Sequence, residues 1–135
     1  MRGDTVNVQN MGIRRELPMS FDEALAKVPE ALKAEGFGIL TEIDVKETMK
    51  KKLDVEFARY RILGACNPPA AHKVLSAEPE IGLLLPCNVI VYDQNGKTVV
   101  SAFNPLHISA FIDKPEIKAV AEEIAAKLTR VVESL

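Results

Sequence analysis

One uninterrupted stretch of 33 residues between the two tyrosines of the chain constrains the fold most. Residues 60–92 read YRILGACNPPAAHKVLSAEPEIGLLLPCNVIVY. The apolar runs at 59–66 and 88–92 predict two strands. Between them, Asn67 is a typical helix cap and Pro68 a typical first helical residue, because a missing amide costs little there. The stretch therefore predicts a strand, a helix, an apolar turn and a second strand, with a cysteine at each strand boundary.

The residues before this stretch predict a helix followed by a strand. Ser20 and Glu23 have the spacing of a capping box, which opens a helix over about residues 21–35. Pro29 predicts a kink in that helix, because proline removes an amide donor and clashes with the preceding turn. Residues 37–44 alternate between apolar and other residues, which predicts a strand with one strongly apolar face.

A short lysine-rich helix is predicted next. Asp44 and Glu47 have the spacing of a second capping box. Lys50, Lys51 and Lys52 follow on the same predicted helix. A lysine cluster can bind an anion, but cations near a helix C-terminus are also favoured by the helix dipole. We therefore interpret the cluster as a solvated helix face.

The residues after the stretch predict a hairpin and a long helix. Asn95-Gly96 favours the positive φ angles of a tight turn, so a strand over 98–103 should pair with the one before it. A short helix or helical turn is expected at 104–112. A final helix should run over 115–133, capped by Asp113. Its apolar stripe is formed by Ile117, Val120, Ala121, Ile124, Leu128, Val131, Val132 and Leu135.

Length and composition limit the classes of protein that the chain can represent. The 135 residues suffice for one domain, predicted over 12–135, and the polar residues 1–11 are interpreted as a loose leader. A formal net charge of −2 and an aromatic content of 5% argue against nucleic-acid binding. No apolar run approaches the ~20 residues of a membrane span. Two cysteines make no disulfide framework, so we expect a cytoplasmic protein with reduced thiols.

Four segments carry a resemblance to a known family. They are SFDEAL, EGFGILTEIDVKETMKKKL, the stretch at 60–92 and the amphipathic helix after KPEI. Together they resemble the domain of unknown function 302 family over about residues 13–135. The resemblance implies an α+β, two-layer fold with a mainly antiparallel sheet and helices on one face, of the TATA-box-binding-protein-like type. It also implies a homodimer, but no activity, catalytic residue or cofactor, and the fold analogy alone does not imply DNA binding.

The two cysteines are the first candidates for chemistry. Cys66 closes one predicted strand and Cys87 opens the next. If those strands are antiparallel, both thiols lie at one end of the sheet and can form a redox pair, or a metal site with a histidine. If the strands are parallel, the thiols lie roughly 17–20 Å apart and neither site exists. The alternative is that both are buried core cysteines.

Three further residues are weaker candidates. His72 should lie on the outer face of its helix, and neither His72 nor His107 has a partner at metal-ligand spacing. We predict no metal site. The helix start at Asn67 can bind an anion through free amides. Pro68 and Pro69 remove two of those donors, which argues against a phosphate site.

Three consecutive leucines form the last candidate site. Leu83, Leu84 and Leu85 cannot all face one core in a short turn, so at least one is expected at a dimer interface or a pocket. The alternative is that all three are buried within one subunit.

Two functional hypotheses follow from these patterns. The first is a non-enzymatic binding or interaction module that works as a homodimer and can hold a small apolar ligand between its sheet and its long helix. The alternative is a thiol-based redox or metal-binding protein that uses Cys66 and Cys87. The chain presents no assembled catalytic set and no cofactor motif, so we favour the first hypothesis and expect no enzyme activity.

Overall fold

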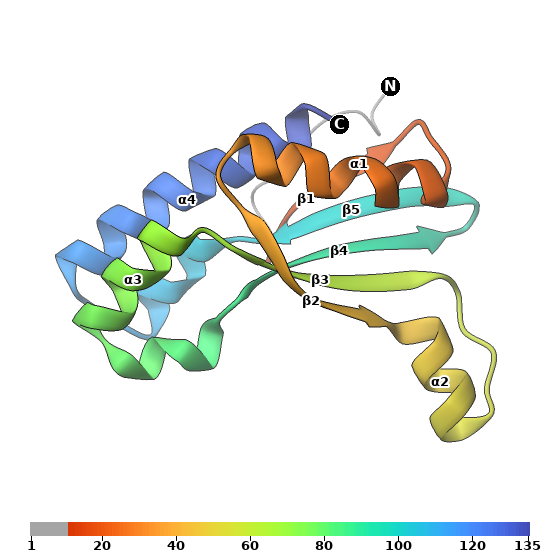
Figure 1. The fold of residues 1–135 in the computed structure, drawn as a ribbon, viewed down its shortest axis with the longest axis horizontal. Coiled ribbons are helices and arrows are strands. Elements are labelled where there is room, and N and C mark those ends of the chain that lie inside the picture. The colour runs from red at the N-terminus through yellow and green to blue at the C-terminus, as the bar shows by residue number, and fades with distance from the viewer. Residues whose placement is uncertain (1–10) are drawn as a thin grey trace.

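A five-stranded antiparallel sheet forms one layer of the computed structural model, which describes residues 11–135 (Figure 1). The predicted leader therefore lies outside the described residues except for Met11. The strand order is β1-β5-β4-β3-β2, and every neighbouring pair is antiparallel. The strands are β1 (Gly12–Leu17), β2 (Gly38–Asp44), β3 (Tyr60–Cys66), β4 (Cys87–Gln94) and β5 (Lys97–Phe103).

Helices form the second layer. The α-helices are α1 (Phe21–Ala34), α2 (Val45–Leu53), α3 (Pro68–Ala77) and α4 (Pro115–Glu133), and the 3-10 helices are η2 (Pro79–Leu84) and η3 (Pro105–Ala110). Helices α1 and α4 cover one face of the sheet, with α3 beside α4 at one end (Figure 1). Helix α2 lies at the opposite end of the molecule, next to β2 and β3. The sheet therefore has a helix-covered face and a largely uncovered face.

The helix starts follow the predicted chemistry, with one exception. Ser20 and Glu23 form the reciprocal capping box of α1, and Asp44 caps α2 by accepting a hydrogen bond from the amide of Glu47. Asp113 does not cap α4, so that prediction is wrong. Pro115 is the first helical residue and restricts Lys114 to extended backbone, so Lys114 occupies the cap position without a side-chain hydrogen bond.

The predicted breaks and turns are also present. Helix α1 continues through Pro29, where the kink stays a prediction, and it ends before Gly36, which has a φ of +88°. Asn95 and Gly96, with φ values of 53° and 79°, form the tight turn between β4 and β5. Two consecutive positive φ values give the backbone twist that matches a two-residue hairpin loop.

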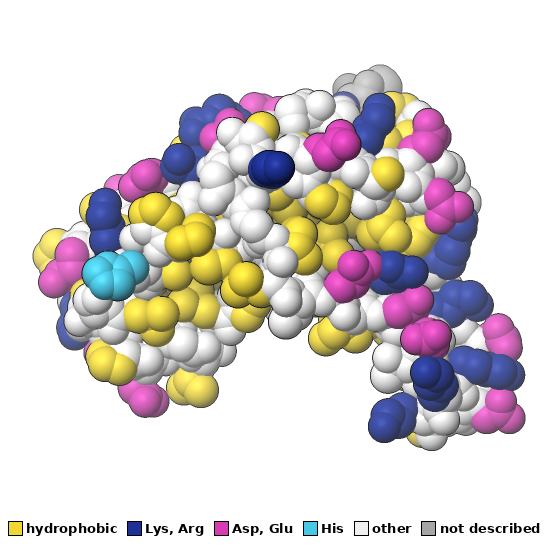
Figure 2. All heavy atoms as spheres, in the orientation of Figure 1, with side chains coloured by type: hydrophobic (Ala, Val, Ile, Leu, Met, Phe, Trp, Pro, Cys, Tyr) yellow, Lys and Arg dark blue, Asp and Glu magenta, His cyan; other side chains and the backbone are white. Residues whose placement is uncertain are grey.

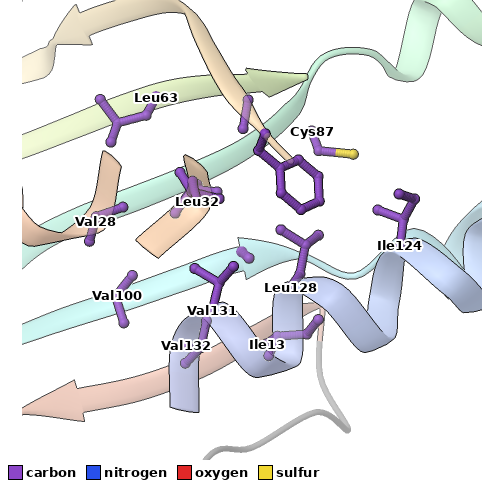
Figure 3. Close-up of a cluster of buried hydrophobic side chains, with 14 of the residues drawn as sticks. Ile13, Val28, Leu32, Leu63, Cys87, Val100, Ile124, Leu128, Val131 and Val132 are labelled. Carbon is purple, nitrogen blue, oxygen red and sulfur yellow. The ribbon is translucent and has the colours of Figure 1, made fainter. Parts of the chain in front are cut away.

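The core lies between the helix-covered face of the sheet and the helices α1 and α4. Figure 3 shows side chains from α1, α4 and the strands β1, β3, β4 and β5 in one cluster. Except for Leu135, which lies beyond the helix end and is only partly buried, the predicted apolar stripe of α4 is buried, and Leu128 is fully buried. Alternate residues of the central strands, such as Val89 and Val91 of β4, meet it from the sheet. Burial of this stripe fixes α4 on the sheet.

The edge strand β2 differs from the prediction of a strongly apolar buried face. Leu40 is 66% exposed and Ile43 is 48% exposed. The pairing with β3 shifts between Ile39 and Thr41, which leaves Leu40 as an extra residue in a bulge. Bulges are common in edge strands, and here the bulge interrupts the alternation of the strand.

Arg15 joins the first strand to the end of the last helix. Its guanidinium NH1 donates to the backbone oxygens of Val132, Glu133 and Leu135, at 3.0, 3.2 and 2.7 Å. These carbonyls lie at the helix C-terminus, where backbone acceptors lack intrahelical partners. Arg15 therefore joins β1 to the C-terminal end of α4 by hydrogen bonds. Its own Nε is buried without a hydrogen-bond partner among the described residues.

Candidate functional site

An apolar cavity of about 280 Å³ opens where the sheet meets α3 and α4. The sheet end contributes Phe37, Ala65 and Cys87. Helix α3 contributes Ala70, Ala71 and Val74, and α4 contributes Ile117, Val120 and Ile124. Cys87 and Ile124 lie at the same end of the core cluster (Figure 3). The cavity is thus continuous with the core and is also open to solvent.

Short side chains explain why the space between these elements is not filled. Ala70 and Ala71 are the α3 residues that face the cavity from its first turn, and Ala65 and Ala121 face them from the sheet and from α4. A methyl side chain cannot span the distance between two packed helices, so the space remains open. The sequence predicts an apolar site between the sheet and the long helix, but it does not identify these alanines as the residues that open the space.

Two exposed leucines lie at the border of the cavity. Leu40, in the bulge of β2, is 66% exposed, and Leu75 of α3 is 40% exposed. On α3, the neighbouring Val74 is buried, whereas Leu75 reaches the surface. Figure 2 shows hydrophobic side chains gathered on the surface around α3. The cavity therefore has an apolar rim that reaches solvent.

Both cysteines line this cavity as free thiols. Strands β3 and β4 are antiparallel, so Cys66 and Cys87 lie at the same end of the sheet. The register pairs Cys87 with Ala65, which places Cys66 one residue further along its strand. Because successive residues of a strand point to opposite faces, this offset does not align the two side chains as a cross-strand pair.

The environment of Cys87 disfavours a thiolate. Its side chain is buried, with 8% of the residue exposed. Burial, and then the nearby charge of Cys66, raise the pKa of Cys87 from 9.0 to about 11. A pKa raised this far lowers the thiolate fraction near neutral pH about a hundredfold. Cys87 is thus protonated under ordinary conditions and is a poor nucleophile.

Asn67 is the one residue of the cavity wall, among those described, with a hydrogen-bonding side chain other than a thiol. Its Oδ1 accepts a hydrogen bond from the amide of Ala70 at 3.2 Å and caps α3, as predicted. Its Nδ2 lies beside Gly36, where an added Cβ would come within 3.1 Å of it. The glycine therefore provides both the positive φ of the turn and room for the amide.

The histidines do not join the cavity. His72 is exposed on α3, as expected for its outer face, and His107 is exposed on η3. Neither lines the cavity. In the part of the chain that the structure describes, no group of three or more histidine, cysteine or acidic side chains can hold a metal ion.

The three leucines at the end of η2, Leu83, Leu84 and the following Leu85, have different environments. Leu83 is 82% exposed, whereas Leu84 and Leu85 pack partly buried against the core. The alternative in which one subunit buries all three is therefore wrong. Leu83, Leu84 and Leu85 also border a second hollow of about 420 Å³ on the uncovered face of the sheet, together with Ile90 and Phe103. We call this the open-face hollow.

Comparisons with known proteins connect this geometry to a family and to a solved structure. Residues 13–135 match the family model described as "Domain of unknown function DUF302". The chain is also similar to the crystal structure of an uncharacterized conserved DUF302 protein from Bacillus stearothermophilus, with 29% sequence identity and a TM-score of 0.84. That similarity covers 91% of this chain and 96% of the other. No curated protein matches the chain.

Proposed function

The chain belongs to the DUF302 family, and from the cavity between α3, α4 and the sheet we propose that it is a non-enzymatic module that binds a small apolar ligand. The observation that carries the proposal is the composition of the cavity wall. Nearly all the side chains that form it are aliphatic or aromatic, and Leu40 and Leu75 continue the apolar lining to the surface. Apolar concave sites with few polar groups are the usual form of ligand pockets.

The cavity volume indicates the size of the ligand. Its 280 Å³ lies at the lower end of the range for small-molecule sites, about 300–1,000 Å³. An apolar cavity of roughly 150 Å³ is known to stay dry and admit benzene. A molecule of about twice that size, with two fused or linked rings or a short hydrocarbon chain, therefore suits the space.

The same wall supports a binding role over catalysis. Among the described residues that line it, none is an aspartate, glutamate, histidine, lysine or arginine. General acid–base catalysis needs such a group within hydrogen-bond reach of the substrate. The two thiols are the remaining candidates, and Cys87 is protonated because burial raises its pKa.

A pair of variants on neighbouring residues of α3 tests the ligand proposal. Ala71→Phe places a phenyl ring in the cavity, whereas His72→Phe places the same ring on the exposed face of the helix. Isothermal titration calorimetry with 2-ethylnaphthalene should show binding to wild type and to His72→Phe, and at least tenfold weaker binding to Ala71→Phe. Equal affinity in all three proteins would place the ligand elsewhere and overturn the proposal.

We further propose a homodimer that forms through the uncovered face of the sheet. The exposed Leu83 and the neighbouring open-face hollow support it, because such apolar surface on a monomer favours association. Leu83→Asp should convert the dimer to a monomer in sedimentation velocity at micromolar concentration, and Lys51→Glu on α2 should not. Leu84 and Leu85 are unsuitable for this test, because they pack on the core and their loss would also destabilise the fold.

Thiol chemistry is a second candidate function, and it is favoured by one observation. Both cysteines face the same cavity at the same end of the sheet. If they form a redox pair, the oxidant diamide should produce an internal disulfide that mass spectrometry detects as a loss of two hydrogens. If they are part of the apolar wall, Cys66→Ala should keep ligand binding, and iodoacetamide should modify native Cys87 far more slowly than unfolded Cys87 at pH 8.

The proposal also covers the domain bounds, the type of fold and the cellular location. We infer a single domain over 12–135 and a TATA-box-binding-protein-like arrangement from the order of strands and helices. A cytoplasmic location stays a prediction from the two cysteines. Between residues 11 and 135, no helix has the length and apolar character required to cross a membrane.

A further inference from the structure

We propose that the ligand of the apolar cavity is uncharged and carries one hydrogen-bond acceptor, which binds the side-chain amide of Asn67. This inference rests on the proposed function, because it concerns the same cavity. It specifies the chemical class of the ligand from three features of the wall. They are the free amide nitrogen of Asn67, the satisfied amides at the start of α3, and the cost of placing a charge in this environment.

The amide orientation of Asn67 is fixed by its cap. The Ala70 amide is a donor, so the atom that faces it at 3.2 Å must be the oxygen Oδ1 and not the nitrogen. Nδ2 is therefore directed away from the helix start and lies beside Gly36. No hydrogen bond to this nitrogen is formed within residues 11–135. Asn67 lines the cavity, and no other described side chain of the cavity wall has an N–H donor.

The start of α3 offers no site for an anion, although helix starts often bind one. Pro68 and Pro69 occupy its first two positions and have no amide hydrogen. The amide of Ala70 binds Asn67 Oδ1, and the amide of Ala71 binds the backbone oxygen of Asn67 at 2.9 Å. Every backbone amide of this first turn that a phosphate or carboxylate would use is therefore missing or already bonded.

The remaining wall disfavours a charge of either sign. No cationic or anionic side chain lines the cavity among the described residues, so an ionised ligand group would be buried without a partner. The ion pair of Lys114 with Glu78 lies at the end of α3, where Lys114 also binds the oxygen of Ala77, and neither residue lines the cavity. Burial in this wall also raises the pKa of Cys87, because the neutral thiol is favoured over the charged thiolate.

A set of probes with one ring system separates charge from hydrogen bonding. 2-Ethylnaphthalene is a neutral hydrocarbon, 2-acetonaphthone adds one carbonyl acceptor, 2-naphthoate is an anion and 2-naphthylmethylamine is a cation at pH 7. Titration calorimetry on the wild-type protein should give the ketone about 3- to 10-fold higher affinity than the hydrocarbon, as expected for one hydrogen bond. The two ions should bind at least tenfold more weakly than the hydrocarbon.

Two variants of Asn67 test the amide without removing the helix cap. Aspartate and serine cap helices about as well as asparagine, but neither supplies the amide donor. Asn67→Asp and Asn67→Ser should abolish the preference for the ketone over the hydrocarbon, measured as the ratio of the two affinities within each variant. Circular dichroism should show that α3 remains folded in both variants.

The outcomes distinguish this inference from the proposed function. If wild type binds the hydrocarbon but shows no preference for the ketone, or if both Asn67 variants keep that preference, the role of Asn67 is wrong and the apolar site stands. Tight binding of the naphthoate would overturn the neutral ligand class in the same way. If none of the four probes binds, the proposed function fails, and this inference fails with it.

Discussion

Helices α2 and α3 both connect neighbouring strands, yet they have opposite environments. Asp44 caps α2 and Asn67 caps α3 by the same side-chain contact, at 3.0 and 3.2 Å. Helix α2 buries none of its residues, whereas α3 packs against α4 and buries Val74. Figure 2 shows charged side chains gathered on α2 and hydrophobic side chains around α3. A cap thus starts a helix in either place, and the side chains on its face decide whether the helix joins the core.

The two helices also differ in how their surface is stabilised. Lys50 pairs with Asp54 and Glu56 at 2.9 and 3.3 Å, in solvent beside α2. Exposed ion pairs of this kind contribute only about 0–1 kcal/mol each. The lysine run is therefore a solvated helix face whose charges are partly paired within the same segment. Helix α3 depends instead on apolar contact, and its alanines leave the cavity open.

The largest expected difference between the two ends is in the free energy of unfolding. Leu128→Ala, in the α4 core against which α3 packs, should destabilise the protein by about 2–5 kcal/mol, because it removes a fully buried side chain. Leu53→Ala, at the end of the exposed α2, should change stability by less than about 0.5 kcal/mol. Urea denaturation measures both. Equal effects would mean that α2 contributes to the core as α3 does.

An intermediate effect is expected from the caps. Asn67→Ala should lower global stability by about 0.5–2 kcal/mol, the usual cost of losing such a cap. Asp44→Ala removes the same contact from α2, but α2 can open locally because it buries no residue. Hydrogen exchange should therefore show faster exchange confined to α2, with little change in the urea midpoint. A fall in global stability as large as that of Asn67→Ala would refute this difference.

The smallest expected effect is a pH dependence at the end of α3. Hydrogen bonds from the Glu80 amide and then from Lys114 hold the pKa of Glu78 below its ordinary value of 4.5. A lowered pKa in the folded state adds stability above pH 4.5, and this is lost as the pH falls through the folded pKa. Glu78→Gln should therefore lower the melting temperature slightly at pH 7 and not at pH 3.

An exposed glutamate near α2 provides the control for this pH experiment. Glu56 pairs with Lys46 and Lys50 at the protein surface and has no contact with the α3–α4 layer described above. Glu56→Gln should leave the melting temperature unchanged within error at pH 7. If Glu78→Gln lowers the melting temperature equally at pH 7 and pH 3, its effect does not arise from the carboxylate charge.

Most elements could be predicted because their signals are local. The capping box of Ser20, the Asn95-Gly96 turn and the stripe of α4 each depend on residues within a few positions of one another. The predicted bounds of α4 agree with the structure. The prediction failed where a neighbour's geometry decided the result, as at Asp113, where Pro115 shifted the cap position to Lys114.

The candidate site was predictable only in part. Cys66, Cys87, Asn67 and Leu85 were chosen from the sequence and all line the cavity. His72 and His107 were chosen because histidine is a reactive residue type, and they lie elsewhere on the surface. The small residues that open the space carry no chemical signal of their own. An alanine indicates a cavity only when its neighbours in three dimensions are known.

The sequence by itself determined the secondary structure, the apolar face of α4 and the family, because hydrophobic periodicity, caps and motifs are properties of the chain order. Only the tertiary structure decided that β3 and β4 are antiparallel, that Arg15 closes the C-terminal end of α4, and that Ala65 and Ala71 face one cavity. The physical reason is that a cavity and a long-range hydrogen bond depend on the distance between residues far apart in the chain. Those distances are fixed by how the helices pack on the sheet.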